Sequence, residues 1–128
     1  MLAPCAWTFD PTYSDVYEKR NACFINKGVC ITKYTGARGK SGTSDASAEY
    51  MSRIRMLLDR TNVLWQIGEL GKVDVGGGGT VAKFVAALDV DTVDLGVPVL
   101  SMHAPFEIVA KTDVYMAFKG FSAFLNMK

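Results

Sequence analysis

The feature that most constrains the fold is a regular alternation of strand-like and helix-like segments. Residues 29–34, 63–70 and 92–100 are rich in β-branched and aromatic side chains, which is typical of strands. Amphipathic or apolar segments with helical spacing follow each of them. Strands that alternate with helices over short connections favour parallel pairing through right-handed crossovers. We therefore expect an α/β fold, a three-layer sandwich or part of one.

The helical segments differ in how clearly they are marked. The clearest one follows Ser44 and Asp45, and apolar residues recur along it at helical spacing up to Leu58. A second helix is expected over residues 80–88 and a third over most of 109–125. In the third, apolar residues line a stripe at steps of three and four. Its members are Val114, Phe118, Phe121 and Leu125.

The beginning of the chain gives weaker signals. The first dozen residues contain Pro4 and Pro11 and are expected to be irregular, and a short helical turn is expected over residues 14–20. Only about three strands are then available, which is fewer than most sheets contain. We infer that residues 1–128 form a single partial domain, the C-terminal part of a larger α/β domain.

The composition supports a folded core and excludes several classes of partner. The chain has 128 residues, 49% of them hydrophobic, and a formal net charge of +1 from 14 basic and 13 acidic residues. This balance gives no electrostatic reason to expect nucleic acid or a membrane surface as a partner. No apolar run approaches the roughly 20 residues of a membrane span, and no signal-peptide pattern opens the chain. A cytoplasmic location is expected.

The cysteines do not suggest a disulfide framework. They are an odd set without CxxC spacing, namely Cys5, Cys23 and Cys30. Reduced, buried or half-buried thiols are expected.

Two glycine-rich segments resemble nucleotide-binding loops only superficially. Residues 36–43 contain Gly39-Lys40-Ser41, but the P-loop pattern needs a glycine where Tyr34 stands. This segment is either a flexible loop or the border of a substrate cleft. Residues 76–82 contain GxGxxA, the relaxed dinucleotide fingerprint, which a run of four glycines also satisfies by chance. The alternative is a close backbone approach to a ligand carbonyl or carboxylate at a helix N-terminus.

The remaining polar candidates lie at the ends of the expected strands. Glu69, Lys72 and Asp74 follow the second strand, and we interpret them as surface charges rather than catalysts. His103 is the only histidine and follows the third strand, with Glu107 four residues later. A lone imidazole is more often packed or solvated than a ligand. Its position at a strand end nevertheless suits metal or acid–base chemistry.

Three segments together carry a family resemblance. They are YTGARGKSGTSDA at residues 34–46, GELGKVDVGGGGT at 68–80 and GVPVLSMHAPFE at 96–107. They resemble the C-terminal part of the aspartyl aminopeptidase and aminopeptidase I family, dinuclear zinc exopeptidases, from about Phe9 to the end of the chain. The resemblance implies that His103 is a zinc ligand and that a peptide is the substrate. It also implies that Lys33, Gly78, Gly79 and Thr80 face this substrate. Because a truncated sheet leaves an edge and apolar helix faces uncovered, we expect the chain to form a homo-oligomer or to require the missing N-terminal segment.

One departure from the family pattern bears on activity. The resemblance places a zinc-binding aspartate where this chain has Pro4, and the other family ligands and the general base lie in a part that this sequence lacks. A zinc site needs three or more protein ligands. We expect an aminopeptidase fragment that is inactive alone. Two alternatives stay open, namely a non-catalytic assembly or partner-binding module derived from such a peptidase, and a small dinucleotide-binding α/β protein.

Overall fold

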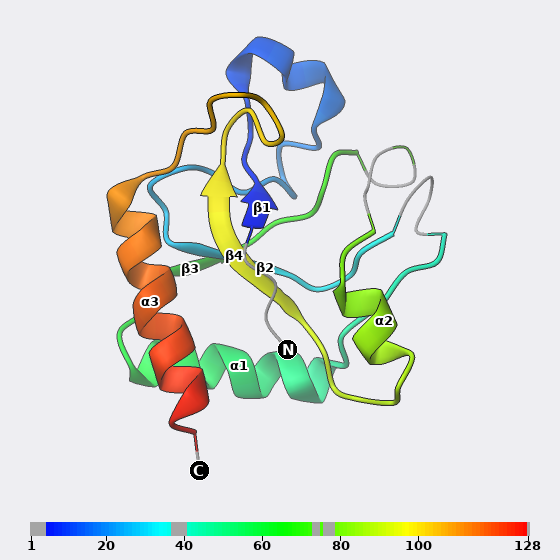
Figure 1. Ribbon diagram of the computed structural model, residues 1–128, viewed down its shortest axis with the longest axis vertical. Coiled ribbons are helices and arrows are strands. Elements are labelled where there is room, and N and C mark those ends of the chain that lie inside the picture. Colours follow the sequence, from blue (N-terminus) through cyan, green and yellow to red (C-terminus); the bar gives the residue numbers. More distant parts are fainter. Residues whose placement is uncertain (1–4, 37–40, 73–74, 76–78, 128) are drawn as a thin grey trace.

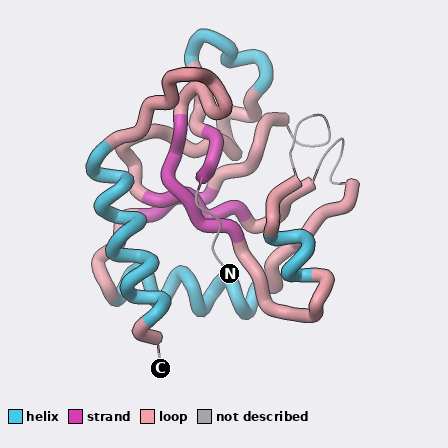
Figure 2. The backbone as a smooth tube through the Cα atoms, viewed as in Figure 1, coloured by secondary structure: helices cyan, strands magenta, loops and turns pink. Residues whose placement is uncertain are grey.

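The protein is a mixed α/β structure built on one four-stranded sheet (Figures 1 and 2). The computed structural model describes residues 5–36, 41–72, 75 and 79–127. The elements in chain order are β1 (Cys5–Trp7), the 3-10 helix η1 (Pro11–Val16), β2 (Val29–Thr32), α1 (Ala48–Arg60), β3 (Trp65–Ile67), α2 (Ala82–Ala86), β4 (Asp94–Val99) and α3 (Lys111–Leu125). The α/β class expected from the sequence is confirmed.

The sheet order is β1-β4-β2-β3, and its pairing is not uniformly parallel. β1 pairs with β4 and β2 pairs with β3 in parallel, but β2 and β4 run antiparallel. The expectation of parallel pairing throughout was therefore wrong for the pair β2 and β4. A parallel crossover needs a dozen or more residues, usually a helix lying along the sheet. α2 has five residues and is too short to serve as that helix.

The sheet has one strand more than the roughly three expected, because the sequence analysis interpreted the segment of β1 as irregular. β1 is three residues long, and its register with β4 pairs Ala6 with Pro98. The Thr8 amide continues the ladder by donating to the Val99 carbonyl at 3.2 Å. Three residues carry too little periodicity to identify a strand, so only the partner strand reveals it.

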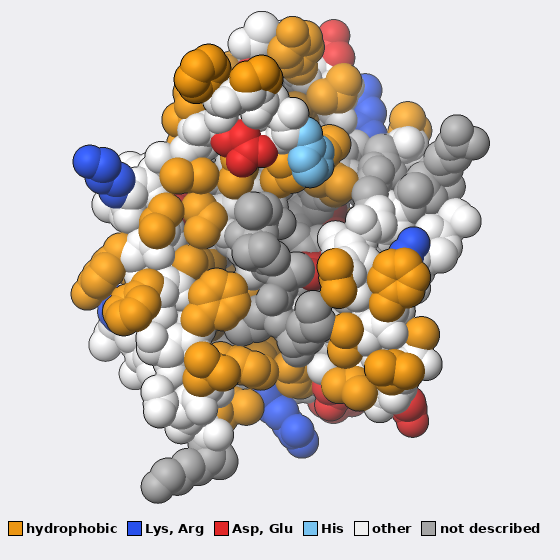
Figure 3. Space-filling model, in the orientation of Figure 1, with side chains coloured by type: hydrophobic (Ala, Val, Ile, Leu, Met, Phe, Trp, Pro, Cys, Tyr) orange, Lys and Arg blue, Asp and Glu red, His pale blue; other side chains and the backbone are white. Residues whose placement is uncertain are grey.

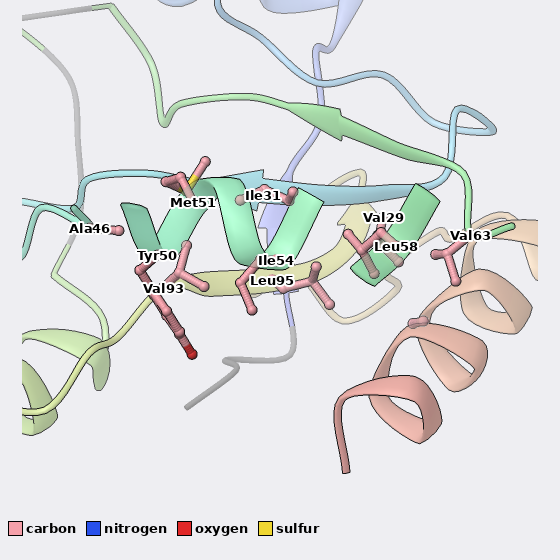
Figure 4. Close-up of a cluster of buried hydrophobic side chains, with 11 residues drawn as sticks. Val29, Ile31, Ala46, Tyr50, Met51, Ile54, Leu58, Val63, Val93 and Leu95 are labelled. Atoms are coloured by element: carbon pink, nitrogen blue, oxygen red, sulfur yellow. The ribbon is translucent and has the colours of Figure 1, made fainter. Parts of the chain in front are cut away.

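The main core lies between the sheet and the helices α1 and α3 (Figure 4). α1 begins after Ser47, whose side chain accepts a hydrogen bond from the Tyr50 amide and caps the helix. The buried residues of α1 recur at helical spacing, as predicted. The core residues are Val29, Ile31, Ala46, Tyr50, Met51, Ile54, Leu58, Val63, Val93, Leu95 and Ala117. Complete burial of one such aliphatic side chain contributes about 1.5–3 kcal/mol.

α3 turns a different face to the sheet from the one that its apolar stripe predicts. Its buried residues are Asp113, Ala117 and Gly120. A β-carbon on Gly120 would lie 3.4 Å from Leu58 Cδ2, already at van der Waals contact with the core. Small residues thus let the α3 backbone approach the core closely. Phe121 packs partly against the core, whereas other members of the predicted stripe remain exposed.

Asp113 joins the start of α3 to the turn before β2. The Asn26 amide donates to Asp113 Oδ2 at 2.6 Å, and the Gly28 amide donates to Oδ1 at 2.8 Å. Asn26 and Gly28 both have positive φ, at 65° and 88°. Asp113 is 1% exposed, so its carboxylate satisfies two backbone donors in a buried turn.

A smaller cluster on the sheet contains Ala6, Cys23 and Cys30. Both thiols are free and buried, which confirms the prediction for these two cysteines. The side-chain hydrogen bond with Cys23, together with burial, raises the pKa of the Cys30 thiol well above its usual value. This keeps the Cys30 thiol protonated.

Among the described residues, no helix is long and apolar enough to cross a membrane.

Candidate functional site

His103 lies in the loop between β4 and α3, just beyond the C-terminal end of β4. An antiparallel bridge between Leu100 and Ile108 closes the base of this loop. Ser101 and His103 both have positive φ, at 56° and 68°, which is uncommon for residues other than glycine. The loop conformation leaves His103 exposed (Figure 3). The imidazole is therefore not a packed core group.

Glu107 fixes the backbone of this loop. Its Oε1 accepts a hydrogen bond from the His103 amide at 2.6 Å. The contact is to the main chain of His103 and not to its ring, so Glu107 sets the loop conformation that presents the imidazole. Trp7 contacts the same loop, because its indole Nε1–H points at Met102 Sδ. The parallel pairing of β1 and β4 explains this contact, since it brings both carboxyl ends to one edge of the sheet.

Lys33 lies at the opposite end of β4 from His103. Lys33 follows β2, whose last residue Thr32 pairs with Asp94, the first residue of β4. The Lys33 amide donates to Glu69 Oε1 at 3.2 Å, and its ammonium group forms an ion pair with Asp45. The five residue steps from Asp94 to the end of β4 span about 16 Å.

Thr80 lies on the same side as Lys33. Its hydroxyl donates to Asp94 Oδ2 at 2.7 Å and accepts from the Ala82 amide at 3.2 Å. Gly79 adjoins the Lys83 side chain, whose Nζ would lie 3.2 Å from an added β-carbon. Gly78 lies outside the described residues. The described substrate candidates thus lie near the C-terminal end of β2 and the start of β4, whereas His103 lies beyond the C-terminal end of β4.

Glu69 is not the surface charge that we expected. It is 7% exposed, and its amide donates to the Asn21 carbonyl at 2.6 Å. Asn21 in turn donates through Nδ2 to the Tyr34 hydroxyl at 3.3 Å. Glu69 therefore belongs to a buried polar cluster that fixes the end of β2. Lys72 is exposed, as expected, and Asp74 lies outside the described residues.

The sequence analysis did not single out Asp94, yet it is a buried carboxylate beside Thr80. It is 5% exposed, and its Oδ1 has no hydrogen-bond partner in the part of the chain that the structure describes. Burial raises the pKa of Asp94, and the hydrogen bond from Thr80 partly offsets this increase. An acidic residue within the apolar run 92–100 was the signal that could have identified it.

The described residues do not supply a complete metal site. They contain no group of three or more His, Cys, Asp or Glu side chains that could hold a metal ion. His103 can offer one imidazole, while Glu107 is engaged with the loop backbone. Pro4 and the glycine-rich stretches 37–40 and 76–78 lie outside the described residues. Among the described residues, His103 is therefore a candidate for one zinc ligand, and the other ligands of a complete site would have to come from outside these residues.

The fold and the exposed histidine beyond β4 define part of an α/β protein with one candidate metal ligand, and the comparisons with known proteins identify its family. The family model for aminopeptidase I zinc metalloprotease (M18) matches residues 3–125. The chain belongs to this family, and the resemblance seen in its sequence is confirmed.

Relatives and solved structures agree with this assignment. The probable M18 family aminopeptidase 1 of Clostridium acetobutylicum is 52% identical over 118 residues, which cover 92% of this chain and 25% of the relative. The crystal structure of aminopeptidase I from that organism matches with a TM-score of 0.90 at 50% identity, over 96% of this chain and 27% of that one. The chain thus spans about a quarter of the length of its curated relatives.

A more distant solved structure concerns assembly. PhTET1-12s, described as a dodecamer, matches with a TM-score of 0.63 at 22% identity and covers 94% of this chain and 31% of that one. At this identity the match shows likeness of fold alone. The solved neighbours nevertheless include oligomeric assemblies.

Proposed function

We propose that this chain is the C-terminal part of a zinc aminopeptidase, with residues 1–128 forming one part of its catalytic domain. In the complete enzyme it contributes His103 as a zinc ligand to a site of two zinc ions, and the substrate is the amino-terminal end of a peptide. Lys33, Gly78, Gly79 and Thr80 bind that substrate away from the metal ligand, because the described ones lie at the start of β4, about 16 Å along the strand from the His103 loop. The complete enzyme is a homo-oligomer.

The observation that carries this proposal is the position of His103. The SMHAPFE loop holds it exposed beyond the carboxyl end of β4, where α/β proteins collect their ligand-binding groups. Two contacts hold the loop in this position. Glu107 accepts a hydrogen bond from the His103 amide, and Trp7 of β1 contacts Met102. These contacts orient the loop from two sides while leaving the ring available.

The same observations limit what the chain does alone. With one imidazole and without a cluster of three ligands among its described residues, it has no means of activating a water molecule on a metal. We expect weak, substoichiometric zinc binding and no aminopeptidase activity from the unmodified chain. Metal analysis of the purified protein and assays with amino-acyl anilides measure both properties. Tight stoichiometric zinc, or zinc-dependent cleavage after removal of contaminating proteases, would contradict this expectation.

A chimera tests the proposal in a complete active site. Residues 3–125 of this chain, with Pro4→Asp, replace the corresponding segment of the clostridial aminopeptidase. The chimera should hydrolyse amino-acyl anilides when supplied with zinc. His103→Ala should remove most of this activity and lower the bound zinc.

The matched control for this experiment is Lys111→Ala, an exposed change at the start of the next helix. It should leave both activity and zinc content near those of the chimera. A His103→Ala chimera that keeps its zinc and its activity would refute the role proposed for His103.

A further inference from the structure

Asp94 is a buried carboxylate at the start of a strand whose other residues are apolar. It is 5% exposed, and its Oδ2 accepts a hydrogen bond from the Thr80 hydroxyl at 2.7 Å. Its Oδ1 has no hydrogen-bond partner within the described residues. Burial of a carboxylate is costly unless its oxygens are hydrogen-bonded, so packing alone does not explain an aspartate at this position. The group on which this carboxylate acts is the Thr80 hydroxyl.

The Thr80 hydroxyl has one hydrogen to donate and two lone pairs that accept hydrogen bonds. Asp94 takes the hydrogen, and the Ala82 amide donates to one of the lone pairs at 3.2 Å. In the described part of the chain, the second lone pair has no donor. Thr80 is half-buried, so this lone pair is open to a ligand. Thr80 therefore meets a ligand as a hydrogen-bond acceptor and not as a donor.

The direction of this hydroxyl is set by the sheet. A hydroxyl hydrogen rotates to suit its surroundings unless an acceptor fixes it. Asp94 is such an acceptor, and it is held in the middle of the sheet because it pairs with Thr32 of β2. Asp94 is too deeply buried to touch a ligand itself. It can act on a ligand only through Thr80.

A hydrogen-bond donor lies next to this acceptor. Lys83 Nζ would lie 3.2 Å from a β-carbon on Gly79, the residue before Thr80. An ammonium group only donates hydrogen bonds. One acceptor and one donor at adjacent positions match the N–H and the C=O of a peptide unit.

We propose that Asp94 is a positioning residue for peptide recognition, which holds the Thr80 hydroxyl as an acceptor for a main-chain N–H of the substrate. This inference rests on the proposed function for its substrate, and it adds the atom of the substrate that Thr80 recognises. The hydroxyl, and not the end of the short helix α2, is the group that meets the ligand.

The position of Thr80 indicates which part of the peptide it contacts. The start of β4 lies about 16 Å along the strand from the His103 loop. An extended peptide covers about 3.3 Å for each residue, so about five residues are needed to reach from one to the other. The recognised N–H therefore belongs to the distal part of a peptide, and an amino-acyl anilide is too short to supply it.

Nuclear magnetic resonance of the full chain tests the proposal, with an uncharged eight-residue peptide of alanine and serine as the probe. Each analogue of this peptide carries one N-methyl group in place of one main-chain N–H. The Ala82 amide bonds to the same hydroxyl, so its resonance should shift as the peptide binds. One analogue should bind about three- to tenfold more weakly than the parent, the loss expected for one hydrogen bond. Absence of binding, or equal binding of all analogues, overturns the proposal.

Substitutions separate positioning from a purely structural role. Thr80→Val removes the acceptor and should abolish the discrimination between parent and analogue. Asp94→Ala frees the hydroxyl hydrogen and should abolish it too, whereas Asp94→Asn keeps an acceptor oxygen and should restore most of it. A structural role for Asp94 would weaken the parent and all analogues alike, and that result would overturn the proposal. Thr12→Val, at an exposed threonine, is the matched control, and circular dichroism verifies that each variant is folded.

The chimera described above distinguishes this inference from the proposed function. With the eight-residue peptide, Thr80→Val and Asp94→Ala should raise KM about three- to tenfold and leave kcat nearly unchanged, as expected for binding far from the reacting bond. Hydrolysis of an amino-acyl anilide should not change. An active chimera whose KM for the peptide does not respond, or whose anilide hydrolysis falls equally, overturns the inference alone. An inactive chimera refutes the proposed function, and the binding experiment then decides the inference.

Discussion

Replacement of Asp113 by alanine should destabilise the protein more than most single substitutions. The carboxylate is 1% exposed and accepts two backbone hydrogen bonds, from the Asn26 and Gly28 amides at 2.6 and 2.8 Å. Hydrogen bonds to a charged group contribute about 1.5–3 kcal/mol each, so the loss of both lowers the free energy of unfolding by about 3–6 kcal/mol. A domain of ordinary stability has about 5–15 kcal/mol in total.

Urea unfolding followed by tryptophan fluorescence and by circular dichroism measures this change. With a typical slope of about 2 kcal/mol per molar urea, the midpoint should fall by about 2 M. Asp113→Asn keeps one acceptor oxygen but sets an NH₂ group against a backbone donor. It should therefore lower the free energy of unfolding by about half as much as Asp113→Ala does. Asp15→Ala, at an exposed aspartate, should change the free energy of unfolding by less than about 0.5 kcal/mol. An Asp113→Ala variant within about 1 kcal/mol of the unmodified chain would refute this account of the turn.

Two further substitutions test other contacts. Gly28→Ala should lower the free energy of unfolding by more than about 3 kcal/mol in thermal or urea unfolding, because φ is +88° and the added β-carbon would lie 2.1 Å from the Leu64 carbonyl oxygen. Gly42→Ala has φ of +59° but open space, so it should cost only about 1 kcal/mol, and equal effects would contradict the steric argument. Because burial raises the pKa of Asp94, its contribution to stability is present below the ordinary value of about 4 and is lost as the pH rises through the folded-state pKa. The stability of Asp94→Asn relative to the unmodified chain should therefore increase from pH 4 to pH 7, and urea midpoints that differ by a constant amount would argue against it.

The sequence predicted the fold class because α1 and the strands around it have strong local patterns. Ser47 caps α1 and Ile54 and Leu58 recur on one face, so local chemistry and tertiary packing agree there. The same holds for β4, whose apolar run is buried as expected. The direction of β4 could not be predicted, because it depends on how the chain travels after α2 and not on any residue within the strand.

The orientation of α3 does not follow from its apolar stripe, for a related reason. A large apolar stripe usually faces the core, but here Ala117 and Gly120 do so because they permit a closer approach of the helix. Glu69 was missed because a carboxylate between glycines usually indicates an exposed loop, whereas the folded chain brings Asn21 and Lys33 around it. Family resemblance, and not spacing, singled out His103 as a ligand, and its role stays a prediction.

The central place of β4 also sets an order of events during synthesis. β4 alone joins β1 to β2, so the sheet stays in two pieces until β4 is made. The β2-α1-β3 unit can close soon after it leaves the ribosome, because its contacts are local. β1 must wait, since the contact between Trp7 and Met102 spans 95 residues. A ribosome that stalls before β4 is made therefore leaves β1 without a partner strand, which exposes this segment to chaperones and to proteolysis.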